Sequence, residues 1–186
     1  MAGPVPLHAW GDRLEALCAS LPGSIETVRV VAEIDSTQDL ARSCGAGTLV
    51  TTGRQRAGRG QRGNEWADTG EHGLAFSICL AATDRPEQSL VLAQALSEAL
   101  GSLLPGRIVV KPPNDLMVDG RKLAGVLIEQ AEALAVIGVG INVGRCCWSD
   151  ELMGHAISLA EAGVEIDRLQ VLEQVLPAVI GAWTGS

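Results

Sequence analysis

The middle of the chain is a series of short apolar segments separated by turn residues. These segments are β-branched or alternate between apolar and polar positions, which is the period of a β-strand. We therefore predict strands over residues 25–34, 48–52, 74–82, 107–111, 116–118, 121–130 and 134–144. Asp119-Gly120 is a strong hairpin signal, and a further turn at 131–133 should complete an antiparallel meander.

Other segments have apolar residues at the spacing of an amphipathic helix. They predict helices over residues 12–21, 39–45, 85–104 and 167–183. Ser36 and Asp167 lie where their side chains would cap the second and the last of these helices. Ser158 and Glu161 have the spacing of a capping box and predict a further, brief helix.

The composition indicates one globular domain spanning residues 1–186, with its core at 25–144 and a helical C-terminal segment at 149–184. The five cysteines are odd in number and scattered, which suits reduced thiols and predicts a cytoplasmic protein. No apolar run approaches the length of a membrane span, and no basic-then-apolar leader begins the chain. We therefore expect no membrane partner.

A basic, glycine-rich loop lies between two of the predicted strands, with the sequence TTGRQRAGRGQRGNEW at 51–66. Its arginines are Arg54, Arg56, Arg59 and Arg62, whereas the whole chain has a net charge of -8. Guanidinium groups bind phosphate and carboxylate, and glycine lets the backbone approach a ligand closely. Local positive charge in an acidic chain predicts a site for a small anion and argues against a nucleic-acid surface. The loop matches neither a dinucleotide-binding motif nor a P-loop.

Two further motifs combine polar residues with glycine, KPPNDLMVDGRKLAGVLIE at 111–129 and GVGINV at 138–143. Pairing across the predicted hairpin should bring Asp115 and Lys122 to one end of the sheet. Each feature also has a purely structural interpretation: a salt bridge for Lys122, a turn for Asn114-Asp115 and a bulge for the glycines. Asn142 is a polar residue in an apolar strand.

In this order the motifs closely resemble the catalytic domain of the biotin-protein ligases. That family has a helix-capping S-T-N, a G-R-G-R-x-G-R-x-W loop, K-W-P-N-D, K-L-x-G-[IV]-L and G-[IV]-G-[IL]-N, and the resemblance runs from about Glu33 to Gly144. It implies an α+β fold like that of class II aminoacyl-tRNA synthetases, with a mixed, largely antiparallel sheet flanked by helices. It also implies that biotin and MgATP give biotinyl-5'-AMP, which then modifies a lysine of biotin carboxyl carrier protein.

The resemblance also implies roles for individual residues. Lys122 and Arg59 would be catalytic. Biotin would be bound by Ser36, Thr37, Gln38, Gln55, Arg59, Gly60, Gln61, Trp66 and Lys122. ATP and its Mg²⁺ would be served by Arg62, Lys111, Asn114, Asp115 and Asn142, with no residue assigned as a metal ligand.

The chain departs from the family pattern at several positions. Gln61 and Asn64 stand where arginines are usual, and Pro112 stands where tryptophan is usual. The chain ends just after the last predicted helix, where relatives continue into a small C-terminal domain, and it lacks the helix-turn-helix of the repressor-type ligases. We therefore expect no DNA partner, and a homodimer is possible.

Other functions remain open at this point. A lipoate or octanoate ligase or transferase has the same fold, but its R-R-x-S-G-G-G loop is absent from this chain. A non-catalytic module that binds biotin or biotinyl-AMP would be consistent with Gln61 and Asn64. RNA binding through the Gly/Arg loop agrees poorly with the acidic composition.

Overall fold

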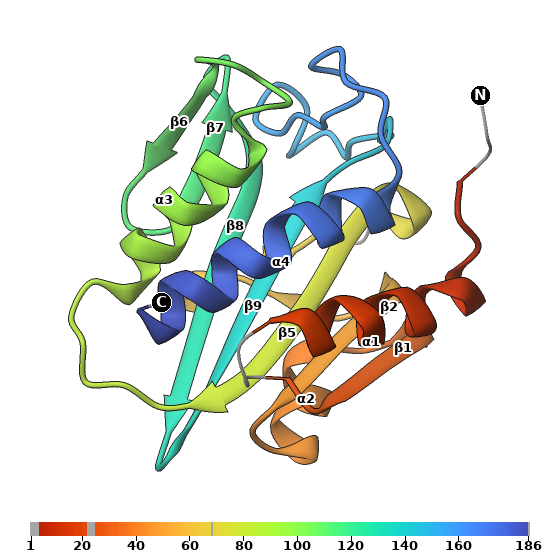
Figure 1. Cartoon of the computed structure of the whole chain (residues 1–186). Helices are drawn as coiled ribbons and strands as arrows, with labels where there is room; N and C mark the ends of the chain where they lie inside the picture. The colour runs from red at the N-terminus through yellow and green to blue at the C-terminus, as the bar shows by residue number, and fades with distance from the viewer. Residues whose placement is uncertain (1–3, 22–24, 68, 186) are drawn as a thin grey trace.

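The computed structural model describes residues 4–21, 25–67 and 69–185. Its centre is a seven-stranded sheet with the strand order β1-β2-β5-β9-β8-β7-β6 (Figure 1). Strands β1 and β2 are parallel, and every other neighbouring pair in this sheet is antiparallel. This confirms the predicted mixed, largely antiparallel sheet flanked by helices.

Each strand predicted from the sequence is present. The strands of this sheet are β1 (Thr27–Ile34), β2 (Thr48–Gln55), β5 (Gly73–Ala81), β6 (Ile108–Lys111), β7 (Asp115–Val118), β8 (Arg121–Ala131) and β9 (Leu134–Asn142). The β7–β8 hairpin turns at Asp119 and Gly120, whose φ angles of 51° and 75° are both in the left-handed region. Two positive φ angles are what a tight hairpin turn requires, so the Asp-Gly prediction is confirmed.

The helices lie on both faces of the sheet. On one face, α1 (Trp10–Ser20), α3 (Gln88–Leu100) and α4 (Arg168–Thr184) pack on the main apolar core (Figure 1). On the other face, α2 (Thr37–Cys44) packs through Ala41 against Val50, Cys79 and Val136. Because α2 is short, it covers only part of its face, and a cavity lies beside it.

The segment between β9 and α4 is less helical than predicted. Ser158 and Glu161 make the hydrogen bonds of a capping box, with Ser158 N donating to Glu161 and Glu161 N donating to Ser158 Oγ at 3.2 Å. The chain nevertheless forms only turns there, and Gly163 at φ 95° directs it away from a helix. The prediction of a brief helix was wrong, and the C-terminal helix begins at Arg168. Its predicted cap at Asp167 is confirmed.

The basic loop is more ordered than the sequence suggested. Strand β2 continues to Gln55, and β3 (Gly58–Arg59) then pairs with β4 (Glu65–Trp66) as a small separate hairpin. A 3₁₀ turn, η2 (Gln61–Gly63), joins the two strands, and similar short turns, η1 (Leu7–Ala9) and η3 (Gly70–His72), lie elsewhere. The predicted helix at 85–104 is shorter, since α3 spans only Gln88–Leu100.

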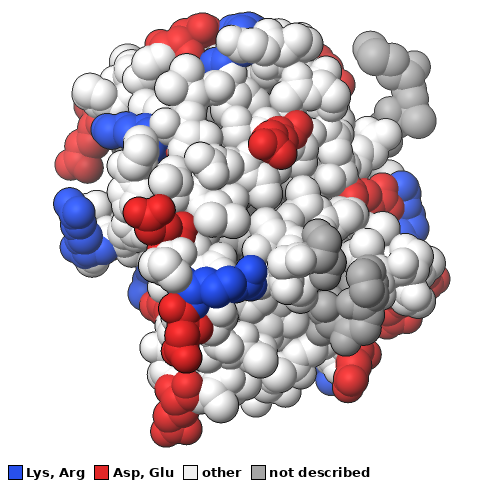
Figure 2. All heavy atoms as spheres, turned by 60° about the vertical axis from the view of Figure 1, so that its left-hand side comes forward, with Lys and Arg blue, Asp and Glu red and all other residues white. Residues whose placement is uncertain are grey.

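Figure 2 shows the side of the molecule that carries α3 and β6, with charged side chains scattered over a mostly uncharged surface. This face has no extended positive area, in agreement with the acidic composition. Within the described ranges, no helix has the length and apolarity needed to cross a membrane.

Candidate active site

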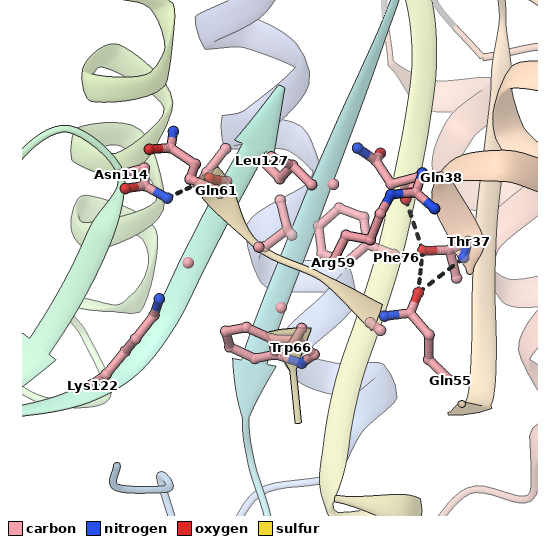
Figure 3. Close-up of a pocket in the computed structure, with 18 residues that line it drawn as sticks. Thr37, Gln38, Gln55, Arg59, Gln61, Trp66, Phe76, Asn114, Lys122 and Leu127 are labelled. Atoms are coloured by element: carbon pink, nitrogen blue, oxygen red, sulfur yellow. Dashed lines mark hydrogen bonds between the residues drawn. The ribbon is translucent and has the colours of Figure 1, made fainter. Parts of the chain in front are cut away.

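A cavity of about 460 Å³, including its open mouth, lies on the α2 face of the sheet (Figure 3). Its walls come from α2, the end of β2, β5, β8, β9, the β3–β4 hairpin and the turn before β7. Nine of the residues predicted for the site line it: Thr37, Gln38, Gln55, Arg59, Gly60, Gln61, Trp66, Asn114 and Lys122. Segments far apart in the sequence are therefore brought together as predicted.

Thr37 forms a hydrogen-bonded network at the α2 end of the cavity. Gln55 Oε1 accepts from Thr37 N at 2.9 Å and lies 3.0 Å from Thr37 Oγ1, which is 2.8 Å from Ser77 Oγ. If Thr37 donates its single hydroxyl proton to Gln55, Ser77 must donate to Thr37, so the chain of bonds has one direction. Ser77 was missed by sequence analysis, although it is a polar residue within the apolar strand LAFSICLAA.

Gln38 is 4% exposed and lies beside this network (Figure 3). Neither its Oε1 nor its Nε2 has a hydrogen-bond partner among the described residues. A buried polar group left without a partner costs about 1 to 3 kcal/mol. The amide therefore indicates a ligand that supplies a donor and an acceptor. Gly138 makes room for it, because a Cβ at this position would lie 3.0 Å from Gln38 Cδ.

Ser36 is at the N-cap of α2, as predicted, but its side chain makes no capping bond with the described residues. Its hydroxyl is buried and has no partner in that part of the chain. The prediction that the Ser36 side chain caps the helix was therefore wrong. Ser36 also lies outside the cavity wall, next to Thr37 and Gln38.

Trp66 forms one wall of the cavity. Its indole lies so close to Gly140 on β9 that any Cβ at this position would collide with the ring. The two glycines of the GVGINV motif thus admit Gln38 at one position and Trp66 at the other. Lys122 Nζ lies 5.6 Å from the centroid of the Trp66 ring, within the range of a cation–π interaction.

Lys122 enters the cavity because of a β-bulge. Leu116 is opposite Ala124, whereas Met117 is opposite Lys122, so β8 has one extra residue at Leu123. Strand alternation from Gly125 would otherwise place Leu123 in the cavity. The bulge instead leaves Leu123 in the apolar core and aims Lys122 at the cavity (Figure 3).

Asp115 compensates the charge of Lys122. Lys122 Nζ is 2.7 Å from Asp115 Oδ1, which confirms that the two residues share one end of the sheet. Gly125 leaves space for the pair, because a Cβ there would be 3.2 Å from Lys122 Cε and 3.3 Å from Asp115 Oδ1. The ammonium group has three protons, so it can contact a second anion without leaving Asp115.

Arg59 holds the β3–β4 hairpin across the mouth of the cavity. It donates to both carboxylate oxygens of Asp39, at 2.9 and 2.7 Å, and contacts Glu129 at 3.3 Å. Glu129 is shared with Arg42 at 3.1 Å. The hydrogen bond between Arg59 and Asp39 lowers the pKa of Asp39. This bond and the hydrogen bond between Arg59 and Glu129 both raise the pKa of Arg59.

Arg56 also pairs within the protein, with Asp35 at 2.9 Å and Glu33 at 3.5 Å. The loop arginines were expected to serve an anionic ligand, but Arg56 and Arg59 also pair with carboxylates of the protein. These carboxylates lie on α2, β1 and β8 and in the turn before α2.

The residues predicted to bind ATP are more dispersed than those predicted to bind biotin. Asn114 lines the cavity, although its Nδ2 donates to Val126 O at 2.8 Å. Arg62 and Lys111 are exposed and lie outside the wall of the cavity. Asn142 is buried behind Lys122 and donates to backbone carbonyls. The described residues contain no cluster of three or more His, Cys, Asp or Glu that could hold a metal ion.

This geometry suits an elongated ligand. Neutral donors and acceptors lie at the α2 end, Trp66 and Phe76 provide apolar walls, and Lys122 lies at the β8 end (Figure 3). A ligand with a neutral polar head, an apolar middle and an anionic tail would satisfy all three regions.

Comparison with known proteins points in the same direction. The model of the biotin/lipoate A/B protein ligase family matches residues 27–142. The chain is 33% identical over 162 residues to a biotin--[acetyl-CoA-carboxylase] ligase of Mycobacterium tuberculosis, covering 79% of this chain and 60% of that protein. It is 33% identical over 156 residues to the bifunctional ligase/repressor BirA of Escherichia coli, covering 76% of this chain and 49% of BirA.

A solved structure supports the fold. The biotin protein ligase from Aquifex aeolicus, in complex with biotin and ATP, superposes with a TM-score of 0.78 at 31% identity. The match covers 86% of this chain and 71% of that one. The chain spans only about half the length of the two sequence relatives, 60% of one and 49% of the other.

Proposed function

Because this chain belongs to the biotin/lipoate A/B protein ligase family, we propose that it is an ATP-dependent biotin-protein ligase. The observation that carries this proposal is the amide of Gln38, which has no partner in the part of the chain that the structure describes, at one end of the cavity, with Lys122 at the other end. The ureido ring of biotin has N–H donors and a carbonyl acceptor, and its valeryl chain ends in a carboxylate. Biotin thus matches both ends.

The first step would join biotin to AMP. A carboxylate oxygen of biotin attacks the α-phosphorus of ATP, the bond from that phosphorus to the bridging oxygen breaks, and pyrophosphate leaves. Two anions about 4 Å apart repel by on the order of 4 kcal/mol at an effective dielectric of about 20. Lys122 would offset this repulsion by contacting both groups, which is electrostatic stabilisation of the developing charge.

The second step would transfer biotin to a carrier protein. The ε-amine of a lysine of biotin carboxyl carrier protein attacks the acyl carbon, an amide forms, AMP leaves with its phosphate oxygen, and the amine loses a proton. Until then the mixed anhydride must be protected from water. Trp66 and the β3–β4 hairpin, which Arg59 fastens to Asp39, lie where they would shield it.

The nucleotide would bring Mg²⁺ with its phosphates. Mg²⁺ is usually held by one or two carboxylates together with substrate phosphates, so a dedicated cluster of protein ligands is not required. Asp115 is the acidic residue nearest to Lys122 and could take part. The predicted roles of Arg62, Lys111 and Asn114 toward ATP belong to this proposal.

The test is pyrophosphate release with ATP and either biotin, lipoate or octanoate. Of the three acids, we expect only biotin to give pyrophosphate release. The dithiolane of lipoate and the chain of octanoate would leave the Gln38 amide without partners, and a site binds such ligands much more weakly. A biotin carrier domain should then become biotinylated at one lysine. Release with lipoate or octanoate but not with biotin would assign the chain to the other branch of the family.

A second candidate is a module that binds biotin or biotinyl-AMP without catalysis. Gln61 and Asn64, where the ligase pattern has arginines, favour it, because each charge-assisted bond to a phosphate is worth about 1.5 to 3 kcal/mol. Tight binding of biotin without release of pyrophosphate would support this candidate.

A further inference from the structure

The segment that carries the β3–β4 hairpin leaves the main sheet at the end of β2 and returns to it at the start of β5. The ladder between β2 and β5 includes the pair Thr52–Ala75, and no pair of these strands is formed beyond it in the described chain. The described part of the segment, residues 54–67 and 69–72, provides five of the cavity residues: Gln55, Arg59, Gly60, Gln61 and Trp66. The point at which the two strands separate therefore helps to set the position of this wall.

Arg168, the first residue of α4, bridges the two strands at this point. Its Nη1 donates to Gly53 O at 3.0 Å and to Gly73 O at 3.1 Å. Gly53 follows Thr52 on β2, and Gly73 is the first residue of β5. Because Nη1 has two protons, it can hold both carbonyls at once. One group of Arg168 thus fixes a backbone carbonyl at each end of the segment.

The guanidinium group of Arg168 is held in place by the start of the chain. Its Cζ lies 5.3 Å from the centroid of the ring of Trp10, which is buried. Trp10 Nε1 donates to Val5 O at 3.1 Å, and Val5 N donates to Asp167 Oδ2 at 2.9 Å. Burial lowers the pKa of Arg168, and the charges of Glu71 and Asp167 oppose this effect. Hydrogen bonds from a partly desolvated cation are stronger than those made in water, so both carbonyls are held firmly.

Arg168 acts from the face of the sheet opposite the cavity. It lies outside the cavity wall, and α4 packs on the main apolar core. Any effect of Arg168 on a ligand must therefore pass through the backbone of Gly53 and Gly73. Gly53 is two residues before Gln55, whose Oε1 accepts from Thr37 N, and the same segment continues to Trp66. Release of the two carbonyls would let this wall move away from the ligand.

We infer that Arg168 is a positioning residue that holds the wall formed by Gln55 and the β3–β4 hairpin in place and thereby slows the dissociation of biotin. This inference rests on the proposed function, which supplies biotin as the ligand. The ion pair between Arg59 and Asp39 fastens the same hairpin at the mouth of the cavity. The segment is thus held at two places, at its base by Arg168 and at the mouth by Arg59.

The test uses the full chain with Arg168→Met, which removes the donors, and with Arg168→Lys, which keeps the charge and one donor group. Arg107→Met is the matched control, because Arg107 Nη1 also donates to a backbone carbonyl, Ala162 O at 2.7 Å, and lies outside the cavity wall. If Arg168→Met does not fold, Arg168→Lys carries the test. The measurements are the rate of biotin dissociation and residue-level hydrogen exchange of the free protein.

We expect biotin to dissociate about 10-fold faster from Arg168→Met, since one hydrogen bond from a charged group is worth about that factor or more. The increase should be smaller in Arg168→Lys, about threefold, and absent in Arg107→Met. Exchange should accelerate in the Arg168 variants at the amides of Gly60 and Asn64, which form hydrogen bonds within the hairpin. It should not change at Val126, whose N donates to Asn114 O at the β8 end of the cavity.

Three results would each overturn the inference. The first is parent-like dissociation of biotin from both Arg168 variants. The second is an equal acceleration of exchange at Val126 and at Gly60, because Arg168 would then stabilise the whole fold and not this wall. The third is an equal effect of Arg107→Met on biotin dissociation.

The proposed function fails in a different way. If the parent chain releases no pyrophosphate with biotin, the ligase proposal is wrong. Biotin dissociation and hydrogen exchange are measured without ATP and without turnover. They therefore test the role of Arg168 separately from the reaction.

Discussion

At its α2 end the cavity holds neutral, buried side chains, whereas at its β8 end it holds the charged, partly exposed side chain of Lys122. The polar atoms of Gln38 have no partner among the described residues. Lys122, by contrast, is paired with the carboxylate of Asp115. The neutral end needs a ligand to complete its hydrogen bonds, while the charged end is already compensated without one.

This difference separates recognition from reaction. A buried amide without a partner discriminates between ligands, because a ligand without hydrogen-bonding groups leaves the defect in place. A cation that already has a counter-ion can share its charge with a developing anion at little cost in reorganisation. Changes at the α2 end should therefore alter affinity and specificity, and changes at the β8 end should alter rates.

The largest effect is expected at the charged end. Lys122→Ala should lower kcat for pyrophosphate release by about 100-fold or more, since removal of one stabilising group from a reaction site typically costs about 100- to 1000-fold. Steady-state kinetics measure the loss, and circular dichroism checks the fold. Arg121→Ala removes the adjacent cation, which lies outside the cavity wall, and should cost less than about threefold. If Lys122→Ala released pyrophosphate at close to the parent rate, the prediction that Lys122 is catalytic would be wrong.

At the neutral end, removing the amide should lower the affinity for biotin without lowering the stability of the free protein. Gln38→Met replaces the amide by an apolar group of similar length, so the free protein should be as stable as the parent or more stable. Affinity for biotin should fall about 10-fold or more, because about 1 to 3 kcal/mol of ligand hydrogen bonding is lost. Calorimetry of biotin binding and thermal unfolding measure the two quantities.

Gln88→Met is the control for Gln38→Met. Gln88 Oε1 is also buried without a partner in the described chain, but Gln88 lies at the start of α3, outside the cavity wall. Its replacement should affect stability in the same way and leave biotin affinity unchanged. If both variants lost the same biotin affinity, the prediction that the Gln38 amide binds biotin would be wrong.

A smaller effect is expected at Gln61, which lines the cavity beside Gly60. Gln61→Arg adds a charge-assisted donor toward the adenylate, so the intermediate should dissociate about 10-fold more slowly. Free biotinyl-adenylate acylates accessible amines, so the parent should label bystander proteins in a lysate, and Gln61→Arg should suppress this labelling while still modifying the carrier. A streptavidin blot detects both.

Self-labelling of the chain gives a second measure of how much biotinyl-adenylate dissociates. The chain has two lysines, Lys111 and Lys122, and Lys122 is the predicted catalytic residue. Mass spectrometry of the labelled chain should therefore detect self-biotinylation at Lys111. Lys111 is exposed. If parent and Gln61→Arg label only the carrier and release adenylate equally slowly, Gln61 is a neutral substitution.

Much of the fold was predictable because local patterns determine it. Strand alternation and the Asp119-Gly120 turn predicted the meander, and the apolar faces predicted the long helices. The same reasoning failed at Ser158 and Glu161, where the capping bonds form without a helix. Spacing alone predicts the capping bonds, but it does not reveal that Gly163 has a φ of 95° and directs the chain away from a helix.

The site was predictable as a set of residues but not as a set of contacts. The motifs identified Lys122 and Asp115, and their ion pair follows from hairpin pairing. The partners of Arg59 could not be read from the loop, because Asp39 and Glu129 are 20 and 70 residues away in sequence. The contact of Ser77 with Thr37 likewise depends on which elements are neighbours in the fold.

The smallest effect is expected at the ion pair that closes the mouth of the cavity. Asp39→Asn removes one partner of Arg59 and should raise the rate of biotin dissociation by about 1.5- to 5-fold, since exposed ion pairs are worth about 0.2 to 1 kcal/mol. Hydrogen exchange in the β3–β4 hairpin should accelerate by a similar factor. Asp35→Asn is the matched control, because Asp35 pairs with Arg56 on the same loop outside the cavity wall. It should leave biotin dissociation unchanged.

The pH dependence of this pair has a definite sign. Arg59 lowers the pKa of Asp39 below its ordinary value of 3.8, so the contribution of the pair is fully present above that value and is lost as the pH falls through the lower pKa of the folded protein. The ratio of exchange rates between Asp39→Asn and the parent should therefore be the same at about pH 5 and about pH 7. It should approach one only below about pH 4. A ratio that already declines between pH 7 and pH 5 would mean that a group other than Asp39 holds the hairpin closed.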